Sequence, residues 1–66
     1  MNIRLNGQEH EIEQEVTVDR FLESIGFGGK PCVVELNQEA VFPRDYTKCL
    51  IREGSCVEIV TLAAGG

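Results

Sequence analysis

The stretch TVDRFLESIG at residues 17–26 decides the fold of this chain, because it carries a clear helical pattern. Apolar residues recur there at the spacing i, i+3, i+4 and i+7, which places them along one face of an α-helix. These residues are Val18, Phe21, Leu22 and Ile25. We expect Thr17 at the N-cap and Gly26 at the left-handed position that ends a helix. Because the sequence predicts no second helix of similar length, this apolar face can be buried only against a sheet.

Strand-like segments lie on both sides of this helix. Residues 2–6 alternate between polar and apolar, as a half-buried strand does. Asn6-Gly7, the strongest short signal for a hairpin, then leads to a polar return strand at residues 9–13. Beyond the helix and a loop at 27–31, strands are predicted at residues 32–37, 40–42 and 56–62, with one helical turn around 46–49.

The order of these elements predicts an α+β fold. A mixed sheet of about four to five strands should pack on one main helix, because nothing else can cover the helix face. The crossover through the helix implies that the strands before and after it are parallel. With the final strand in the middle of the sheet, this is a β-grasp arrangement. We expect residues 1–62 to form the β-grasp domain and residues 63–66 to form a flexible C-terminal tail ending in Gly-Gly.

Composition narrows the classes of function. The chain has 66 residues and a net charge of −5, and its six Lys and Arg residues are scattered singly, so no basic footprint for nucleic acid exists. No apolar run approaches the ~20 residues of a membrane helix. The N-terminal residues lack the layout of a secretion signal. We therefore expect a cytoplasmic protein with neither a nucleic-acid nor a membrane partner.

The three cysteines do not form a recognisable site. Cys32, Cys49 and Cys56 are odd in number and widely spaced, and the single His10 is distant from them in sequence. Zinc sites need four closely organised ligands and disulfide frameworks need even counts. We predict no metal site and interpret the three residues as buried free thiols that act as small hydrophobes.

Several motifs together carry a resemblance to a known family. They are LNGQ near the start, the helix TVDRFLESIG, the segment VVELNQEAVFPR at residues 33–44, and EGSCVEIVTLAAGG at residues 53–66. On these residues the chain resembles the ThiS family of sulfur carrier proteins of thiamin biosynthesis, which are ubiquitin-like and related to MoaD. One departure is Ser55, where such families often carry an acidic residue.

The resemblance implies a carrier without catalytic residues or a bound cofactor. Its terminal Gly66 carboxylate would be adenylated with ATP by a ThiF-like enzyme and converted to a thiocarboxylate. A sulfur donor protein, such as a cysteine desulfurase, would supply the sulfur. The thiocarboxylate would then give its sulfur to a ThiG-like thiazole synthase, for the thiazole ring of thiamin.

The tail suits this chemistry physically. Gly66 has no side chain to crowd the reacting carbon, and Gly65 lets the walls of a partner's channel approach closely. Ala63 and Ala64 form a slim connection to the domain. Four extended residues reach at most ~13 Å into a recessed site.

An interface is predicted beside the tail. If Val57 and Ile59 face the core, then Glu58, Val60 and Leu62 point outward. The neighbouring strand would present Val33 on the same face. A cluster of outward apolar residues indicates a partner surface, unless a loop covers it.

Other functions remain open from the sequence. A MoaD-type carrier of molybdopterin synthase would use the same thiocarboxylate, although the short length here favours the thiamin pathway. A ubiquitin-like modifier would join Gly66 to a lysine of another protein. A regulatory or ligand-binding β-grasp module would not need the tail.

Overall fold

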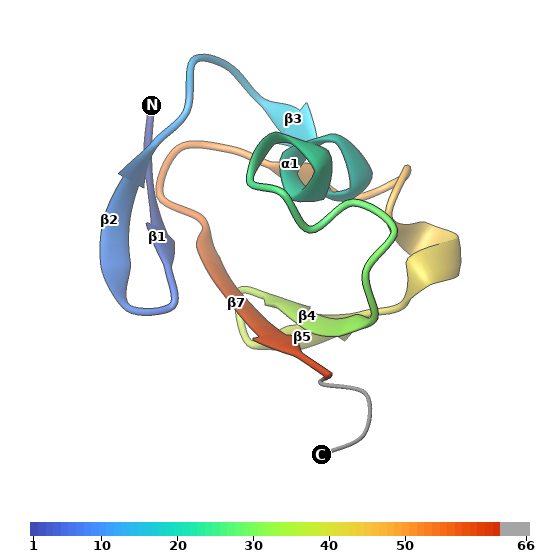
Figure 1. Cartoon of the computed structure of the whole chain (residues 1–66). Helices are drawn as coiled ribbons and strands as arrows, with labels where there is room; N and C mark the ends of the chain where they lie inside the picture. The colour runs from blue at the N-terminus through green and yellow to red at the C-terminus, as the bar shows by residue number, and fades with distance from the viewer. Residues whose placement is uncertain (63–66) are drawn as a thin grey trace.

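The computed structural model of the chain describes residues 1–62 and shows a mixed sheet curled around one helix (Figure 1). Five strands form this sheet in the order β2-β1-β7-β4-β5. They are β1 (Asn2–Leu5), β2 (Gln8–Glu11), β4 (Cys32–Leu36), β5 (Glu39–Val41) and β7 (Cys56–Thr61). The final strand lies in the middle, parallel to β1 and antiparallel to β4. The predicted β-grasp architecture is therefore confirmed.

Helix α1 (Val18–Ser24) crosses the concave side of the sheet (Figure 1). Its predicted apolar face supplies much of the core, since Val18, Phe21 and Leu22 are buried. The core also contains Ile3, Val34, Ile51, Val57 and Ile59. A domain of this size buries only about 60% of its unfolded surface, so each of these positions matters.

The ends of α1 are only partly as the sequence predicts. Gly26 has a φ of 87°, the left-handed conformation expected after a helix. Thr17 occupies the N-cap position, but its side chain makes no capping hydrogen bond. The first N–H groups of the helix instead donate hydrogen bonds to backbone carbonyls of the distant segment after β5. The Val18 N–H, for example, donates to Cys49 O at 3.0 Å. Tertiary contacts thus take over the role of the cap.

Both hairpin turns are made by residues with positive φ, at Asn6-Gly7 and at Asn37-Gln38. The two asparagine side chains also bind the central strand. Asn6 Oδ1 accepts from the Ile59 N–H at 2.8 Å, and Asn37 Oδ1 accepts from the Cys56 N–H at 2.9 Å. These bonds hold the outer hairpins on either side of β7.

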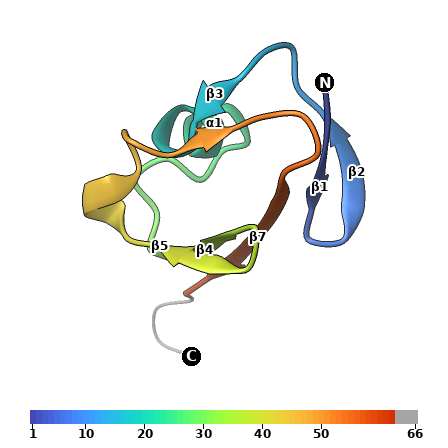
Figure 2. The ribbon, with the colours of Figure 1, turned by 180° about the vertical axis from the view of Figure 1, so that it is seen from behind.

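The structure contains a second, two-stranded sheet that the sequence analysis does not predict. Strand β3 (Val16–Thr17) pairs antiparallel with β6 (Leu50–Ile51) beside the helix (Figure 2). The predicted helical turn around residues 46–49 is also misplaced, because a 3₁₀ turn, η1, spans Pro43–Asp45. Proline has its φ fixed near the helical value and no N–H to satisfy, which makes it suited to the first position. Within residues 1–62, no helix is long and apolar enough to cross a membrane.

Candidate functional site at the end of the central strand

The chain leaves the sheet at the C-terminal end of the central strand β7. Thr61 still pairs with Cys32, and the Leu62 N–H donates to Pro31 O at 3.1 Å. The backbone is therefore held by hydrogen bonds up to the last described residue. The predicted sulfur-carrying Gly66, with Gly65, Ala64 and Ala63, lies outside the described residues.

The outer face of the sheet beside this end is apolar. Val57 and Ile59 are buried, whereas Val60 is 62% exposed and Leu62 is 54% exposed. Val33 is 48% exposed and lies directly opposite Val60 in the strand register. The structure thus brings the predicted interface residues Val33 and Val60 together, with exposed Glu58 next to them on β7. Leu62 lies just past the end of β7, at the border of this face. In the described part of the chain these side chains remain open to solvent, so the covering loop considered above is not found.

Sequence reasoning missed a further member of this surface, Phe42. Val41 pairs with Val34 and faces inward, so the following residue, still extended, lies on the face of Val33. Phe42 is 54% exposed, and the Arg44 guanidinium lies 5.1 Å from the centre of its ring. The alternation of Val41 and Phe42 in a strand stopped by proline is the signal that could have revealed it.

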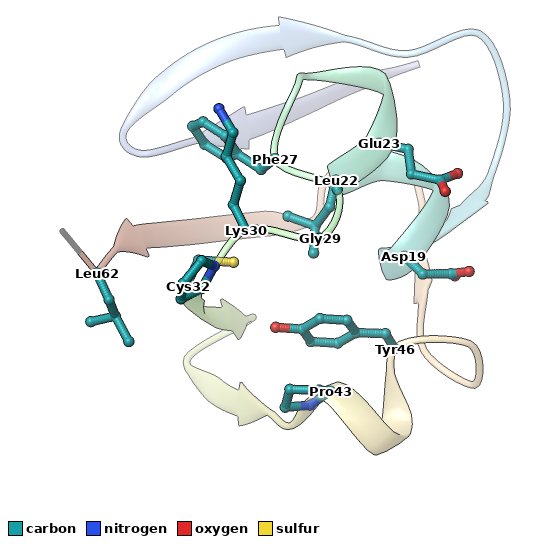
Figure 3. Close-up of a pocket in the computed structure, with 12 residues that line it drawn as sticks. Asp19, Leu22, Glu23, Phe27, Gly29, Lys30, Cys32, Pro43, Tyr46 and Leu62 are labelled. Atoms are coloured by element: carbon teal, nitrogen blue, oxygen red, sulfur yellow. The ribbon is translucent and has the colours of Figure 1, made fainter. Parts of the chain in front are cut away.

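A cleft opens on the inner side of the same edge, between α1, the loop after it and the 3₁₀ turn (Figure 3). Its volume is about 430 Å³, and its walls are mainly apolar. The Tyr46 hydroxyl points toward Cys32 across it. Burial, and next the neighbouring Cys32 thiol, raise the pKa of the Tyr46 phenol above its usual 10.0. Leu62 also lines this cleft, which links it to the end of β7.

The cysteine prediction is only partly right. Cys32 and Cys49 are half-buried against the core, as small hydrophobes would be. Cys56 is exposed, so its assignment as a buried thiol is wrong. The reason is its place on β7, one residue before buried Val57 and therefore on the outer face. Among residues 1–62, no group of His, Cys, Asp and Glu is arranged to hold a metal ion.

Ser55 closes the turn before β7 with two hydrogen bonds to Arg52. Its buried hydroxyl accepts from the Arg52 N–H at 3.0 Å, and its own N–H donates to Arg52 O at 3.0 Å. Gly54 between them has a φ of 81°, which L side chains rarely adopt.

The fold is that of a ubiquitin-like β-grasp protein. Its central strand runs parallel to the first strand, one helix crosses the sheet, and an apolar face is exposed beside the end of the central strand. The crystal structure of the thiamine biosynthesis protein ThiS from Geobacter metallireducens has the same fold, with a TM-score of 0.87 and 23% identity over 100% of both chains. The solution structure of a thiamine biosynthesis protein from that organism matches with a TM-score of 0.83 and 23% identity. The match covers 100% of this chain and 88% of the other.

The chain belongs to the ThiS family, whose model matches residues 3–66. Similar curated proteins are the thiazole synthases of Magnetococcus marinus, at 32% identity, and Paramagnetospirillum magneticum, at 30%. Each match covers 100% of this chain but only 20% of the relative. The chain thus spans about a fifth of the length of these relatives.

Proposed function

We propose that this chain is a sulfur carrier of thiamin biosynthesis whose Gly66 carboxylate becomes a thiocarboxylate. The single observation that carries the proposal is the ThiS family match, which extends over residues 3–66 and so includes the diglycine. The carrier performs no catalysis; it is a co-substrate that partner enzymes modify and discharge.

The chemistry follows from the weakness of a carboxylate as an electrophile. An adenylating partner transfers AMP from ATP to a Gly66 carboxylate oxygen, and pyrophosphate leaves. The persulfide of a donor protein, such as a cysteine desulfurase, then attacks the acyl carbon and displaces AMP. A thiol of a partner protein reduces the resulting acyl disulfide, which leaves the thiocarboxylate on Gly66 and a disulfide on the partner. No cofactor is bound by the carrier in this scheme, because ATP is consumed in the partner's site.

The outer face beside the strand end would serve as the docking surface. Val33, Val60 and Leu62 are exposed there, and Glu58 adds a charge at the border. Apolar side chains gathered on a small surface favour association with another protein. From this surface the tail reaches up to ~13 Å into a recessed site.

Thiazole synthase is the acceptor that the relatives support. The two relatives named thiazole synthase contain a segment that matches the whole of this chain within a longer polypeptide. Joining two modules in one chain raises their effective concentration, which is useful when one must act on the other. The three free thiols fit a reducing cytoplasm, where we place the reaction.

The test is intact-mass spectrometry of the purified chain with ATP, an adenylating enzyme of the ThiF type and a sulfur donor. The protein should gain the mass difference between sulfur and oxygen, localised to Gly66. Appending one alanine after Gly66 should abolish the gain while circular dichroism remains unchanged. A full gain of mass in the extended variant would refute the proposal.

The acceptor is tested separately with the charged protein. Sulfur should appear in the thiazole when thiazole synthase is supplied. Delivery to a pterin precursor alone would assign the chain to molybdopterin synthesis, and attachment to lysines of other proteins would make it a modifier.

A further inference from the structure

The side chain of Asn6 continues the sheet beyond the point where strand β1 ends. Strand β1 pairs with β7 as far as Leu5 and Val57, and the chain then turns into the hairpin with β2 (Figure 1). At Ile59, farther along β7, Asn6 Oδ1 accepts from the N–H at 2.8 Å and Nδ2 donates to the carbonyl oxygen at 3.3 Å. One side-chain amide thus replaces the peptide groups that a longer β1 would offer. We call these two hydrogen bonds the Asn6 clamp.

Asn6 also precedes the glycine of the turn, and this order of residues favours loss of the side-chain amide. In that reaction the next main-chain nitrogen attacks Cγ of the asparagine, so a following residue without Cβ hinders the attack least. Asparagine counts among the thermolabile residues for this kind of reason. The other two asparagines are followed by larger residues, since Ile3 comes after Asn2 and Gln38 after Asn37.

The surroundings of Gly7 leave the attacking nitrogen free and the site open. Within residues 1–62 the Gly7 N–H donates to no backbone carbonyl. Apart from the adjoining residues, no described atom lies within 4 Å of the point where a Cβ would stand on Gly7. Both Asn6 and Gly7 are exposed, so water reaches the turn. The turn therefore has the nucleophile, the space and the solvent that the reaction needs.

We propose that Asn6 is a modification site, at which the protein loses ammonia at a rate set by the Asn6 clamp. The Gly7 nitrogen gives its proton to a base in the solvent and attacks Asn6 Cγ. The bond from Cγ to Nδ2 breaks, and Nδ2 takes up a proton and leaves as ammonia. Water then opens the succinimide ring at one of its two carbonyl carbons, which leaves aspartate or isoaspartate at position 6.

The Asn6 clamp opposes this reaction in the folded protein. While both hydrogen bonds are made, the side-chain amide is fixed beside β7 and Cγ cannot turn toward the Gly7 nitrogen. The reaction therefore requires a local opening of the two bonds. Since each such bond contributes modestly to stability, the folded chain should react at least about tenfold more slowly than the unfolded chain.

Loss of the amide removes the clamp permanently. An ionised carboxylate can only accept hydrogen bonds, so it can keep the Ile59 N–H but repels the Ile59 carbonyl oxygen. Isoaspartate also adds an atom to the main chain of the two-residue turn, whose length fixes the register of the hairpin. The modified chain should therefore hold β7 less firmly on the side of β1.

The first experiment incubates the full chain at mildly alkaline pH, folded and in denaturant, and follows it by intact mass and peptide mapping. The mass difference between an amide and a carboxyl group should appear at Asn6 before it appears at Asn2 or Asn37. The folded protein should react at least about tenfold more slowly than the denatured chain. Earlier modification of Asn2 or Asn37 overturns the choice of site, and equal rates overturn the role of the clamp.

A matched pair of variants measures what the modification does to the fold. Asn6→Asp and Asn37→Asp add the same charge, each in a hairpin turn beside β7. Within residues 1–62 Asn37 binds β7 through Oδ1, an acceptor that aspartate retains. Asn6→Asp should lower the thermal midpoint by ~4–8 °C and Asn37→Asp by less than ~2 °C. Equal losses would assign the effect to the added charge and overturn the inference.

The chemistry at Asn6 is independent of sulfur carriage, so the two proposals fail separately. A chain that gains sulfur at Gly66 but keeps its Asn6 amide in denaturant overturns the modification site alone. A chain that loses ammonia at Asn6 as expected but never gains sulfur supports the modification site and refutes the carrier function.

Discussion

At the scale of single residues, Tyr46 connects the core to the edge where β7 ends. Its ring lies in the cleft lined by Leu62, and its hydroxyl faces Cys32 (Figure 3). Burial raises the pKa of the phenol, with a smaller effect from the thiol. The neutral phenol is therefore the form that suits the folded protein.

Because the folded-state pKa of Tyr46 lies above the ordinary 10.0, its contribution to stability is present below pH 10.0 and is lost as pH rises through the folded-state value. The chain has one Tyr and no Trp, so ultraviolet absorbance of the phenolate reports this residue alone. We expect a titration midpoint above that of the unfolded chain in denaturant. Tyr46→Phe should flatten the alkaline decline in the free energy of unfolding. Equal midpoints in folded and unfolded protein would contradict this.

At the scale of elements, α1 is the part that the sequence predicts best. Its apolar spacing indicates both the helix and its buried face, and Val18, Phe21 and Leu22 are indeed in the core. The strands that alternate are predicted with similar success. Strands β3 and β6 are not, because two-residue strands carry no periodicity and form only where tertiary packing brings them together.

The helix also offers the sharpest stability test. Phe21→Ala should cost about 3–5 kcal/mol, because it removes a large fully buried ring from a thin core. Total stabilities of domains are only about 5–15 kcal/mol, so much of this variant should be unfolded at 37 °C. Arg20→Ala, one residue away and exposed, is the control and should change stability by less than ~0.5 kcal/mol. Chemical denaturation measures both.

At the scale of the whole molecule, the candidate site is formed by segments that lie far apart in the sequence. Alternation predicts that Val60 and Val33 face outward on neighbouring strands, and the structure adds their direct pairing and the extension to Phe42. The pairing of Glu35 with Glu58 across β4 and β7 could not be predicted, because it depends on the register between two strands. Residue type identifies the candidates, whereas tertiary pairing decides which of them meet.

The proposed carrier uses an acyl group and no thiol, so its cysteines should be dispensable for loading. Cys56→Ser, on the outer face, should keep stability within ~0.5 kcal/mol. Replacing Cys32 and Cys49 with alanine should lower stability, because both pack against the core. In each case the mass gain at Gly66 should persist. Loss of loading in a variant that remains folded would show that sulfur passes through a cysteine.

The central position of β7 has a mechanical consequence. A partner that pulls on the chain beyond Leu62 applies force along a strand bonded to β1 on one side and β4 on the other. That force loads both ladders in shear, so their hydrogen bonds share the tension instead of opening one after another as in peeling. We therefore expect the domain to stay folded when it is pulled from this end.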